Sequence, residues 1–182
     1  MSKVSIKGAD TGTGVFTIES PATNTDFASR FDYVDGKLYW KANANQKVRF
    51  KEAGFVTKKG YRKVEFDGRK YGTHQIVFAL HHGYIPNAVD HINTDKLDNR
   101  IENLREADRC QNGYNRGMTA SNTSGIKNVA YRADSDKWRV TLRVDGRTKS
   151  FGSYFDIELA ELVSFEARDK WHGEYANHGG SL

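Results

Sequence analysis

A run of small polar residues from Gly117 to Gly125 most constrains how this chain can fold. The run is rich in Thr, Ser, Asn and Gly and has no apolar periodicity, so residues 117–124 are predicted to form a linker. The linker divides a chain of 182 residues into two segments, each of which can bury only a modest core. We therefore expect two small modules rather than one large fold.

Composition favours a folded protein without a membrane segment. Apolar residues make up 37% of the chain and aromatic residues 12%, as in globular proteins. No apolar run is long enough for a membrane span and the N-terminus lacks a signal-peptide core, so we expect a cytoplasmic location. The single cysteine, Cys110, excludes an internal disulfide and a four-cysteine zinc site. We expect no structural zinc, and any metal must be held by oxygen or histidine ligands.

Positive charge is concentrated in the middle of the chain. Residues 31–116 hold 16 Lys and Arg against 11 Asp and Glu, which accounts for the whole net charge of +5. Residues 127–149 carry seven basic and three acidic residues, whereas residues 156–174 carry two basic and six acidic ones. This distribution favours an anionic partner and predicts that the C-terminal module has one basic and one acidic face.

The coarse secondary structure is of the α+β class. Asp35-Gly36 and Asp67-Gly68 separate short β-prone runs, which predicts two N-terminal β-hairpins. Apolar residues between His74 and His82 predict a short buried helix that ends at Gly83. After the linker, Val140, Leu142 and Val144 alternate with polar residues, as in a strand with one wet face, and Asp145-Gly146 turns the chain back. Apolar residues at four-residue intervals from Ile157 to Trp171 predict an amphipathic helix.

The most informative chemistry lies between Val89 and Asn112. Hydrolysis of a phosphodiester needs a base that deprotonates water and a cation that stabilises charge on the phosphate. Histidine suits the first role near neutral pH, and the oxygens of Asp and Asn side chains suit Mg²⁺ or Mn²⁺. An Asp-His pair by itself is usually a surface turn, so the case depends on the surrounding pattern.

That pattern resembles the ββα-metal motif of HNH homing endonucleases. The resemblance includes Asp90-His91, Asn103 and Asn112 within the stretch VDHINTDKLDNRIENLREADRCQN, and it extends over residues 31–116. It implies a metal-dependent, site-specific DNA endonuclease that leaves 5′-phosphate and 3′-hydroxyl ends. In this family His91 would be the general base, Asp90 and Asn112 would bind one Mg²⁺ or Mn²⁺, and Asn103 would orient the His91 ring or nearby backbone. Apart from the resemblance, two roles stay open for Asn115, contact with DNA or a cap of the helix that closes this module.

Residues 123–178 resemble an AP2 DNA-binding domain, and the domain itself is expected to span residues 125–178. The matching residues include SGIKNV from Ser124, KWRV from Lys137, FGSYF from Phe151 and GEYAN from Gly173. The resemblance implies a three-stranded sheet with one helix, whose basic face enters the major groove of double-stranded DNA. The candidate DNA-binding residues of this module are Arg132, Arg139, Thr141, Arg143, Arg147 and Lys149. In the middle module, the candidates around the hairpins are Arg62, Lys63 and Arg69, and these would follow the phosphate backbone.

The ends of the chain and the mode of cutting leave alternatives open. Residues 1–30 are predicted to form a separate arm that faintly resembles phage tail-fibre sequence, and residues 179–182 form a short tail. The chief alternative function is a DNA-binding regulator that uses the AP2-like domain and keeps the nuclease module only as a scaffold. The intact set of Asp90, His91, Asn103 and Asn112 favours the enzyme. A monomer would nick DNA, whereas a homodimer could cut both strands.

Overall fold

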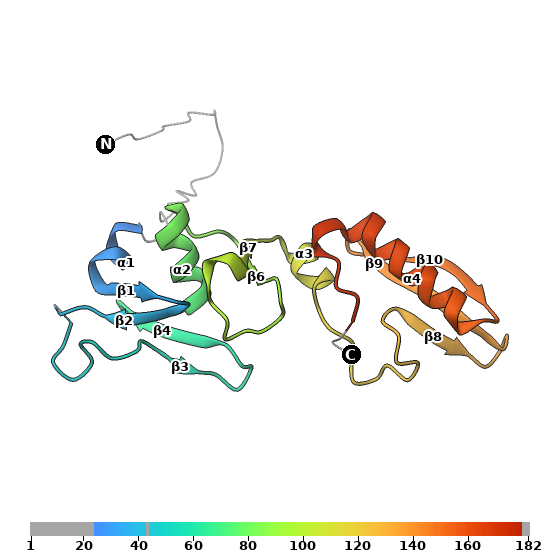
Figure 1. Ribbon diagram of the computed structural model, residues 1–182, viewed down its shortest axis with the longest axis horizontal. Coiled ribbons are helices and arrows are strands. Elements are labelled where there is room, and N and C mark those ends of the chain that lie inside the picture. Colours follow the sequence, from blue (N-terminus) through green and yellow to red (C-terminus); the bar gives the residue numbers. More distant parts are fainter. Residues whose placement is uncertain (1–23, 43, 180–182) are drawn as a thin grey trace, which may run out of the picture.

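The protein consists of two small α+β halves, each with its own hydrophobic core. The computed structural model describes residues 24–42 and 44–179. Figure 1 shows the halves side by side along the long axis, with helix α3 (Arg109–Tyr114) between them. One apolar cluster lies between Phe27 and Leu104 and the other between Val129 and Ala167, so the expectation of two modest cores agrees with the packing.

The N-terminal half contains short strands around one central helix. Its elements before α3 are α1 (Asn24–Arg30), β1 (Phe31–Val34), β2 (Lys37–Trp40), β3 (Phe55–Val56), β4 (Arg62–Phe66), β5 (Arg69–Gly72), α2 (Thr73–His82), β6 (Val89–His91), the 3₁₀ helix η1 (Ile101–Asn103) and β7 (Leu104–Glu106). The strands form a β1–β2 hairpin, a β3–β4–β5 sheet and a β6–β7 hairpin, all antiparallel.

The expected hairpins and helices are present. Asp35 and Gly36 both have positive φ, as do Asp67 and Gly68, which is the conformation that two-residue hairpin turns require. Helix α2 ends at His82 because Gly83 adopts the left-handed conformation and donates its N–H to the Ala79 carbonyl. The hairpin and α2 predictions are therefore confirmed.

The core of the N-terminal half extends into residues that were assigned to the arm. Phe27 in α1 is fully buried and packs against the rings of Phe66 and Tyr71. The boundary expected at residue 30 therefore falls inside this core. The remainder of the predicted arm, residues 1–23, lies outside the described residues.

The C-terminal half is a three-stranded antiparallel sheet covered by one helix. Its elements are β8 (Val129–Arg132), β9 (Lys137–Val144), β10 (Arg147–Tyr154), α4 (Ile157–His172) and the 3₁₀ helix η2 (Gly173–Tyr175). The strand order is β10–β9–β8, and α4 packs on the face that carries Val140, Leu142 and Val144. The alternating strand and the amphipathic helix predicted for this half are both present.

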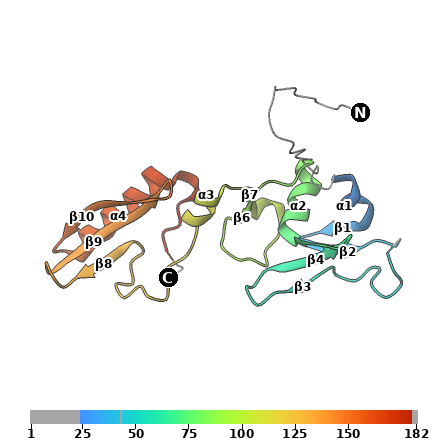
Figure 2. The ribbon, with the colours of Figure 1, turned by 180° about the vertical axis from the view of Figure 1, so that it is seen from behind.

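The two halves are joined by specific contacts as well as by the chain itself. The Tyr114 ring at the end of α3 stacks on the His172 ring at the end of α4, with centroids 3.9 Å apart. Lys127 donates to the carbonyl oxygens of Tyr114 and Asn177. Figures 1 and 2 show from both sides that the segment after α4 turns back toward α3. Residues 173–178 therefore belong to the junction.

Within the part of the chain that the structure describes, no helix combines the length and apolarity needed to cross a bilayer.

Candidate active site

The β6–β7 hairpin buries Asp90 and His91, and Asn115 at the end of α3 bonds the Asp90 carboxylate and the His91 backbone oxygen. All three residues of β6 are buried, and the register pairs Asp90 with Arg105 and His91 with Leu104. Directly opposed residues of an antiparallel pair point to the same face, so Asp90 and Arg105 meet across the hairpin. Figure 1 shows β6 and β7 beside α3, which brings Asn112 into the same region.

One oxygen of the Asp90 carboxylate is held by three hydrogen bonds. Arg105 donates to Oδ2 from Nε at 3.0 Å and from Nη2 at 2.8 Å, and the Asn115 amide donates to the same atom at 2.9 Å. Asn115 also donates to the backbone oxygen of His91 at 2.7 Å. The sequence left open whether Asn115 touches DNA or caps the helix. The structure gives it a buried place at the end of α3, where it fixes the Asp90-His91 pair.

The hydrogen bonds of His91 define its tautomer. Nε2 lies 3.1 Å from Oδ1 of Asn99, and the Asn99 amide nitrogen donates to the Leu97 carbonyl at 3.0 Å, which fixes the orientation of the amide. An amide oxygen only accepts, so Nε2 of His91 carries the proton and Nδ1 presents a lone pair. No hydrogen bond from the described residues reaches Nδ1. This nitrogen is therefore free to accept a proton.

The surroundings also keep His91 in its neutral form near neutral pH. Burial lowers the pKa of His91 below its usual value, and this effect exceeds the opposing ones of the Asn99 hydrogen bond and the charge of Asp90. A general base must be unprotonated before it can act, so the lowered pKa suits that role.

Asn103 and Asn99 share the orienting role that the family resemblance implied for Asn103. The Asn103 amide accepts from the backbone N–H of Asn93 at 2.9 Å and donates to the Asp98 carbonyl at 2.8 Å. It therefore fixes the loop after β6, which is the nearby-backbone option. Asn99, which sequence reasoning missed, contacts the imidazole itself. Asn99 lies two residues after Leu97 in a polar loop, and its distance in sequence from His91 did not identify it as a site residue.

Replacement of Asn99 by alanine is expected to slow cleavage without abolishing DNA binding. Loss of a buried hydrogen-bond partner costs about 1–3 kcal/mol, which corresponds to roughly a ten- to hundred-fold decrease in rate if it is expressed in the transition state. The measurement is the single-turnover cleavage rate, with exposed Asn45→Ala as the matched control. Equal rates for the two variants would contradict the role of Asn99.

Asp90 and Asn112 offer oxygen atoms that fit a divalent cation. Oδ1 of Asp90 and the side chain of Asn112 have no hydrogen-bond partner among the described residues, and both residues line one cavity with His91. Carboxylate and amide oxygens suit Mg²⁺ or Mn²⁺, which keep several water ligands. In residues 24–42 and 44–179, no group of three or more His, Cys, Asp or Glu could hold a metal ion. A cation here would need water or phosphate oxygens as further ligands.

The cavity beside His91 continues into a basic groove. Its volume of about 330 Å³ lies in the range of ligand pockets, and its walls include Tyr61, Lys96 and Arg116. A second cavity shares Tyr61, Val89 and Asn112 with the first. The basic residues that line this second cavity are Lys58, Lys59 and Lys63. Together the cavities can take a phosphate and an adjoining stretch of anionic backbone.

Comparison with known proteins identifies the family of this site. Protein 3.8 of Escherichia phage T7 is 30% identical over 105 residues, which cover 57% of this chain and 86% of the phage protein. Residues 71–114 match the family model described as HNH endonuclease, and this stretch contains Asp90, His91, Asn103 and Asn112. Residues 71–114 therefore form an HNH endonuclease domain. This domain supports a nuclease activity with DNA as the substrate.

A second relative supports the family but differs in extent. An uncharacterized HNH endonuclease of Acanthamoeba polyphaga mimivirus is 36% identical over 125 residues, which cover 67% of this chain. The match spans 64% of the viral protein, slightly less than two thirds of its length. No solved structure matches the chain significantly.

His74 is a partly buried neighbour of His91, and its Nδ1 is fully buried. Its ring meets the His91 ring edge-on at 5.0 Å, and its Nδ1 has no partner among the described residues. Burial, followed by the charges of His91 and Lys63, lowers the pKa of His74 to about 4. His74 therefore packs against His91 as a neutral ring.

This burial makes the stability of the nuclease pH-dependent. An unfolded histidine binds a proton below about pH 6.5, whereas folded His74 resists protonation until about pH 4. The unfolded state then binds more protons, so the free energy of unfolding falls by about 3 kcal/mol between these pH values. His74→Phe should lose that part of the pH dependence, measured by urea unfolding at pH 7 and pH 4.5, while exposed His82→Ala should keep it. An unchanged dependence in His74→Phe would refute the assignment.

The basic candidates of the middle module do not form one surface. Arg62 is ion-paired with Glu52 at 3.2 Å and donates to the Gly54 carbonyl, so its charge is already compensated. Neighbouring residues of a strand point to opposite faces, which separates Lys63 from Arg62 on β4. Arg69 lies opposite Phe66 in the β4–β5 pair, and only Lys63 of the three lines the basic groove.

On the C-terminal sheet, four candidates share the face away from α4. Arg139, Thr141 and Arg143 alternate with the buried residues of β9, and Arg132 lies opposite Lys137 on the same outer side. The register of β8 and β9 therefore agrees with the prediction that these residues lie on one face of the sheet.

The placement of Arg147 and Lys149 on that face was wrong. The register pairs Arg147 with Val144 and Lys149 with Leu142, and opposed residues share a face, so both lie on the side of α4. The Lys149 ammonium accordingly lies 3.8 Å from the centroid of the Trp171 ring of α4. The polar residues that β10 adds to the outer face are Thr148, Ser150 and Ser153.

Proposed function

We propose that this chain is a metal-dependent, site-specific DNA endonuclease of the homing type, which hydrolyses a phosphodiester to a 5′-phosphate and a 3′-hydroxyl. One observation carries the proposal. The Asn99 amide fixes the proton of His91 on Nε2 and leaves Nδ1 as a free acceptor, and His91 lines one cavity with Asp90 and Asn112. A base next to two free oxygen ligands supports hydrolysis better than a purely DNA-binding role.

The side chains would act on water and phosphate as follows. Nδ1 of His91 takes a proton from a water molecule, whose oxygen attacks phosphorus while the bond from phosphorus to the 3′ oxygen breaks. The 3′ oxygen leaves and gains a proton from solvent. Asn99 keeps the imidazole aligned during this transfer, and Asn103 keeps the following loop in place. Lys96 and Arg116 in the cavity wall add positive charge beside the phosphate.

Asp90 and Asn112 would hold the divalent ion, with Arg105 and Asn115 fixing the Asp90 carboxylate. When bound, Mg²⁺ or Mn²⁺ would neutralise charge on the phosphate and on the leaving oxygen.

The C-terminal half would find the target as an AP2-like domain. The three-stranded sheet with one helix supports this proposal, as does the set of polar and basic side chains on its free face. Arg139 and Thr141 would reach base edges in the major groove, because arginine forks to guanine and a hydroxyl pairs with either base edge. Selection of the site then depends on this sheet, and cutting depends on the β6–β7 hairpin.

The proposal is tested by incubating the full chain with supercoiled plasmid and phage DNA in Mg²⁺, in Mn²⁺ and in EDTA. We expect nicked or linear products only with a metal, and we expect those ends to be joined again by DNA ligase, which needs a 5′-phosphate and a 3′-hydroxyl. Intact DNA in every metal, together with tight DNA binding, would support the regulator instead. Cleavage that persists in EDTA would contradict metal dependence.

A further inference from the structure

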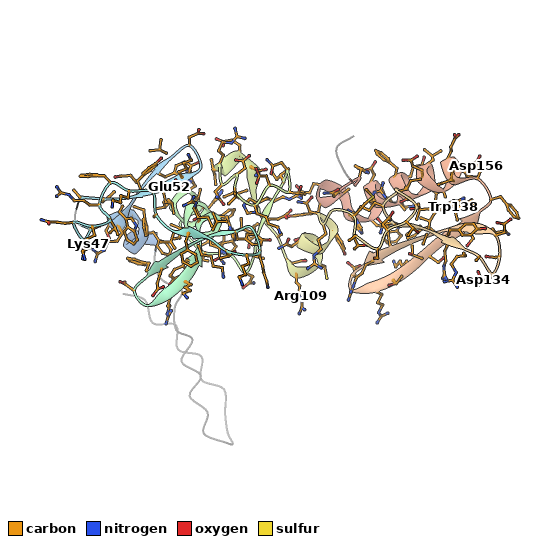
Figure 3. All side chains as sticks on the ribbon, turned by 90° about the horizontal axis from the view of Figure 1, so that it is seen from below. Lys47, Glu52, Arg109, Asp134, Trp138 and Asp156 are labelled. Carbon is orange, nitrogen blue, oxygen red and sulfur yellow. The ribbon has the colours of Figure 1, made fainter. Side chains whose placement is uncertain are left out.

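Three arginines line a cavity at the junction of the two halves. Arg109 and Arg116 come from the region of α3, and Arg143 comes from β9. Figure 3 shows Arg109 between the two halves, with its side chain pointing away from the ribbon. The cavity has a volume of about 510 Å³, and all three side chains are exposed. Among the described residues, none of the three forms an ion pair.

The acidic residues nearest in sequence to these arginines are engaged elsewhere. Asp108 caps α3 by accepting from the backbone N–H groups of Cys110 and Gln111. The Asp145 carboxylate accepts from the Tyr114 hydroxyl at 3.3 Å. No acidic side chain of the described residues lines the cavity, whereas Lys127 also lines it. Among the described residues, the cavity is therefore lined by basic side chains and by no acidic one.

Arg116 connects this cavity with the active site and with the outer face of the sheet. It lines the cavity that contains Asp90 and His91, and it lines the junction cavity. A third cavity includes Arg116 together with Ala130 and Thr141 of the sheet. The three cavities thus share Arg116 as a wall residue. They form a series that begins at His91 and ends at the outer face of β9.

We propose that the junction cavity binds phosphate groups of the DNA strand between the cleaved bond and the sequence read by the sheet. This inference rests on the proposed function. The planar fork of arginine matches the oxygens of a phosphate, and three such groups from both halves would hold successive phosphates. Phosphate contacts fix register rather than sequence. The junction would therefore set the distance between the recognised sequence and the cut.

The test measures how salt affects DNA binding. The full chain in EDTA, where no cutting occurs, is titrated with a labelled duplex of random sequence at several NaCl concentrations. Each neutralised phosphate contributes about 0.9 to the slope of log affinity against log salt, so changing Arg109, Arg116 and Arg143 together to alanine should lower the slope by roughly 2 to 3. The matched control is Arg49→Ala. Arg49 is exposed and lies two residues from Lys47, which Figure 3 places at the far end of the N-terminal half.

Two further results separate the possible failures. The triple change to lysine keeps three cations and should keep most of the slope, so an alanine variant that fails to fold does not end the test. An unchanged slope in the folded alanine variant, while the wild type still cuts plasmid DNA, would overturn the junction site and leave the nuclease assignment intact. A wild type that neither binds nor cuts DNA would overturn both.

Discussion

His91→Ala is expected to lower the single-turnover rate of plasmid cleavage by about 10²- to 10⁴-fold, the usual contribution of a general base. The reason is geometric. Nε2 of His91 is occupied by Asn99, which leaves Nδ1 without a hydrogen-bond partner among the described residues, and His91 lines the same cavity as Asp90 and Asn112. The measurement is the conversion of supercoiled to nicked or linear plasmid in Mg²⁺ with enzyme in excess.

Binding and folding have to be separated from this loss of rate. DNA affinity of His91→Ala in EDTA should stay close to that of the wild type, because the sheet and the junction are unchanged. His82→Ala is the matched control, since His82 is exposed on α2 and lies outside both cavities around the site. A variant with lost cleavage and equally lost affinity would point to misfolding rather than to the loss of a base.

Arg105→Met is expected to destabilise the protein by about 3 kcal/mol, because it leaves the buried Asp90 carboxylate without its ionic partner. Only 15% of the Arg105 side chain and 6% of the Asp90 side chain are exposed, so water replaces the lost contacts poorly. The same guanidinium stacks on the Tyr175 ring at 4.2 Å, so its loss also loosens the segment after α4. Urea unfolding measures the effect.

The control for Arg105 is an exposed ion pair of the same type. Arg132 and Asp134 are 3.3 Å apart, with 49% and 68% of their side chains exposed, so Arg132→Met should change stability by less than about 1 kcal/mol. Equal losses of unfolding free energy in the two variants would mean that the Asp90–Arg105 pair stabilises the protein no more than an exposed ion pair does. Cleavage should also decrease in Arg105→Met, since Asp90 loses two of its three hydrogen bonds.

Local patterns predicted much of the fold. Asp-Gly pairs predicted hairpins correctly at Asp35-Gly36 and Asp67-Gly68, because both residue types tolerate the positive φ that such turns require. The alternation from Val140 to Val144 and the four-residue spacing after Ile157 predicted β9 and α4, because an element buried on one face needs apolar residues at regular intervals. Asp90, His91 and Asn112 were recognised as a set, and they do line one cavity.

Contacts between distant residues were not predicted. Arg105 meets Asp90 through the register of a hairpin with a long loop, and Asn115 reaches it from α3, so no short spacing indicates either contact. The sidedness of β10 could have been predicted. With Asp145-Gly146 as a two-residue turn, Arg147 must pair with Val144 and share its face. The prediction did not take this register into account, so it placed Arg147 and Lys149 on the wrong face of the sheet.

The most direct test of the central claim is chemical rescue of His91→Ala by imidazole. The variant is mixed with plasmid DNA and Mg²⁺, and the single-turnover rate is measured as imidazole is added. If His91 supplies the base, the rate should rise with the concentration of neutral imidazole, while the wild type and His82→Ala should not respond. A variant that already cuts at the wild-type rate, or one that binds DNA but gains nothing from imidazole, would contradict the claim.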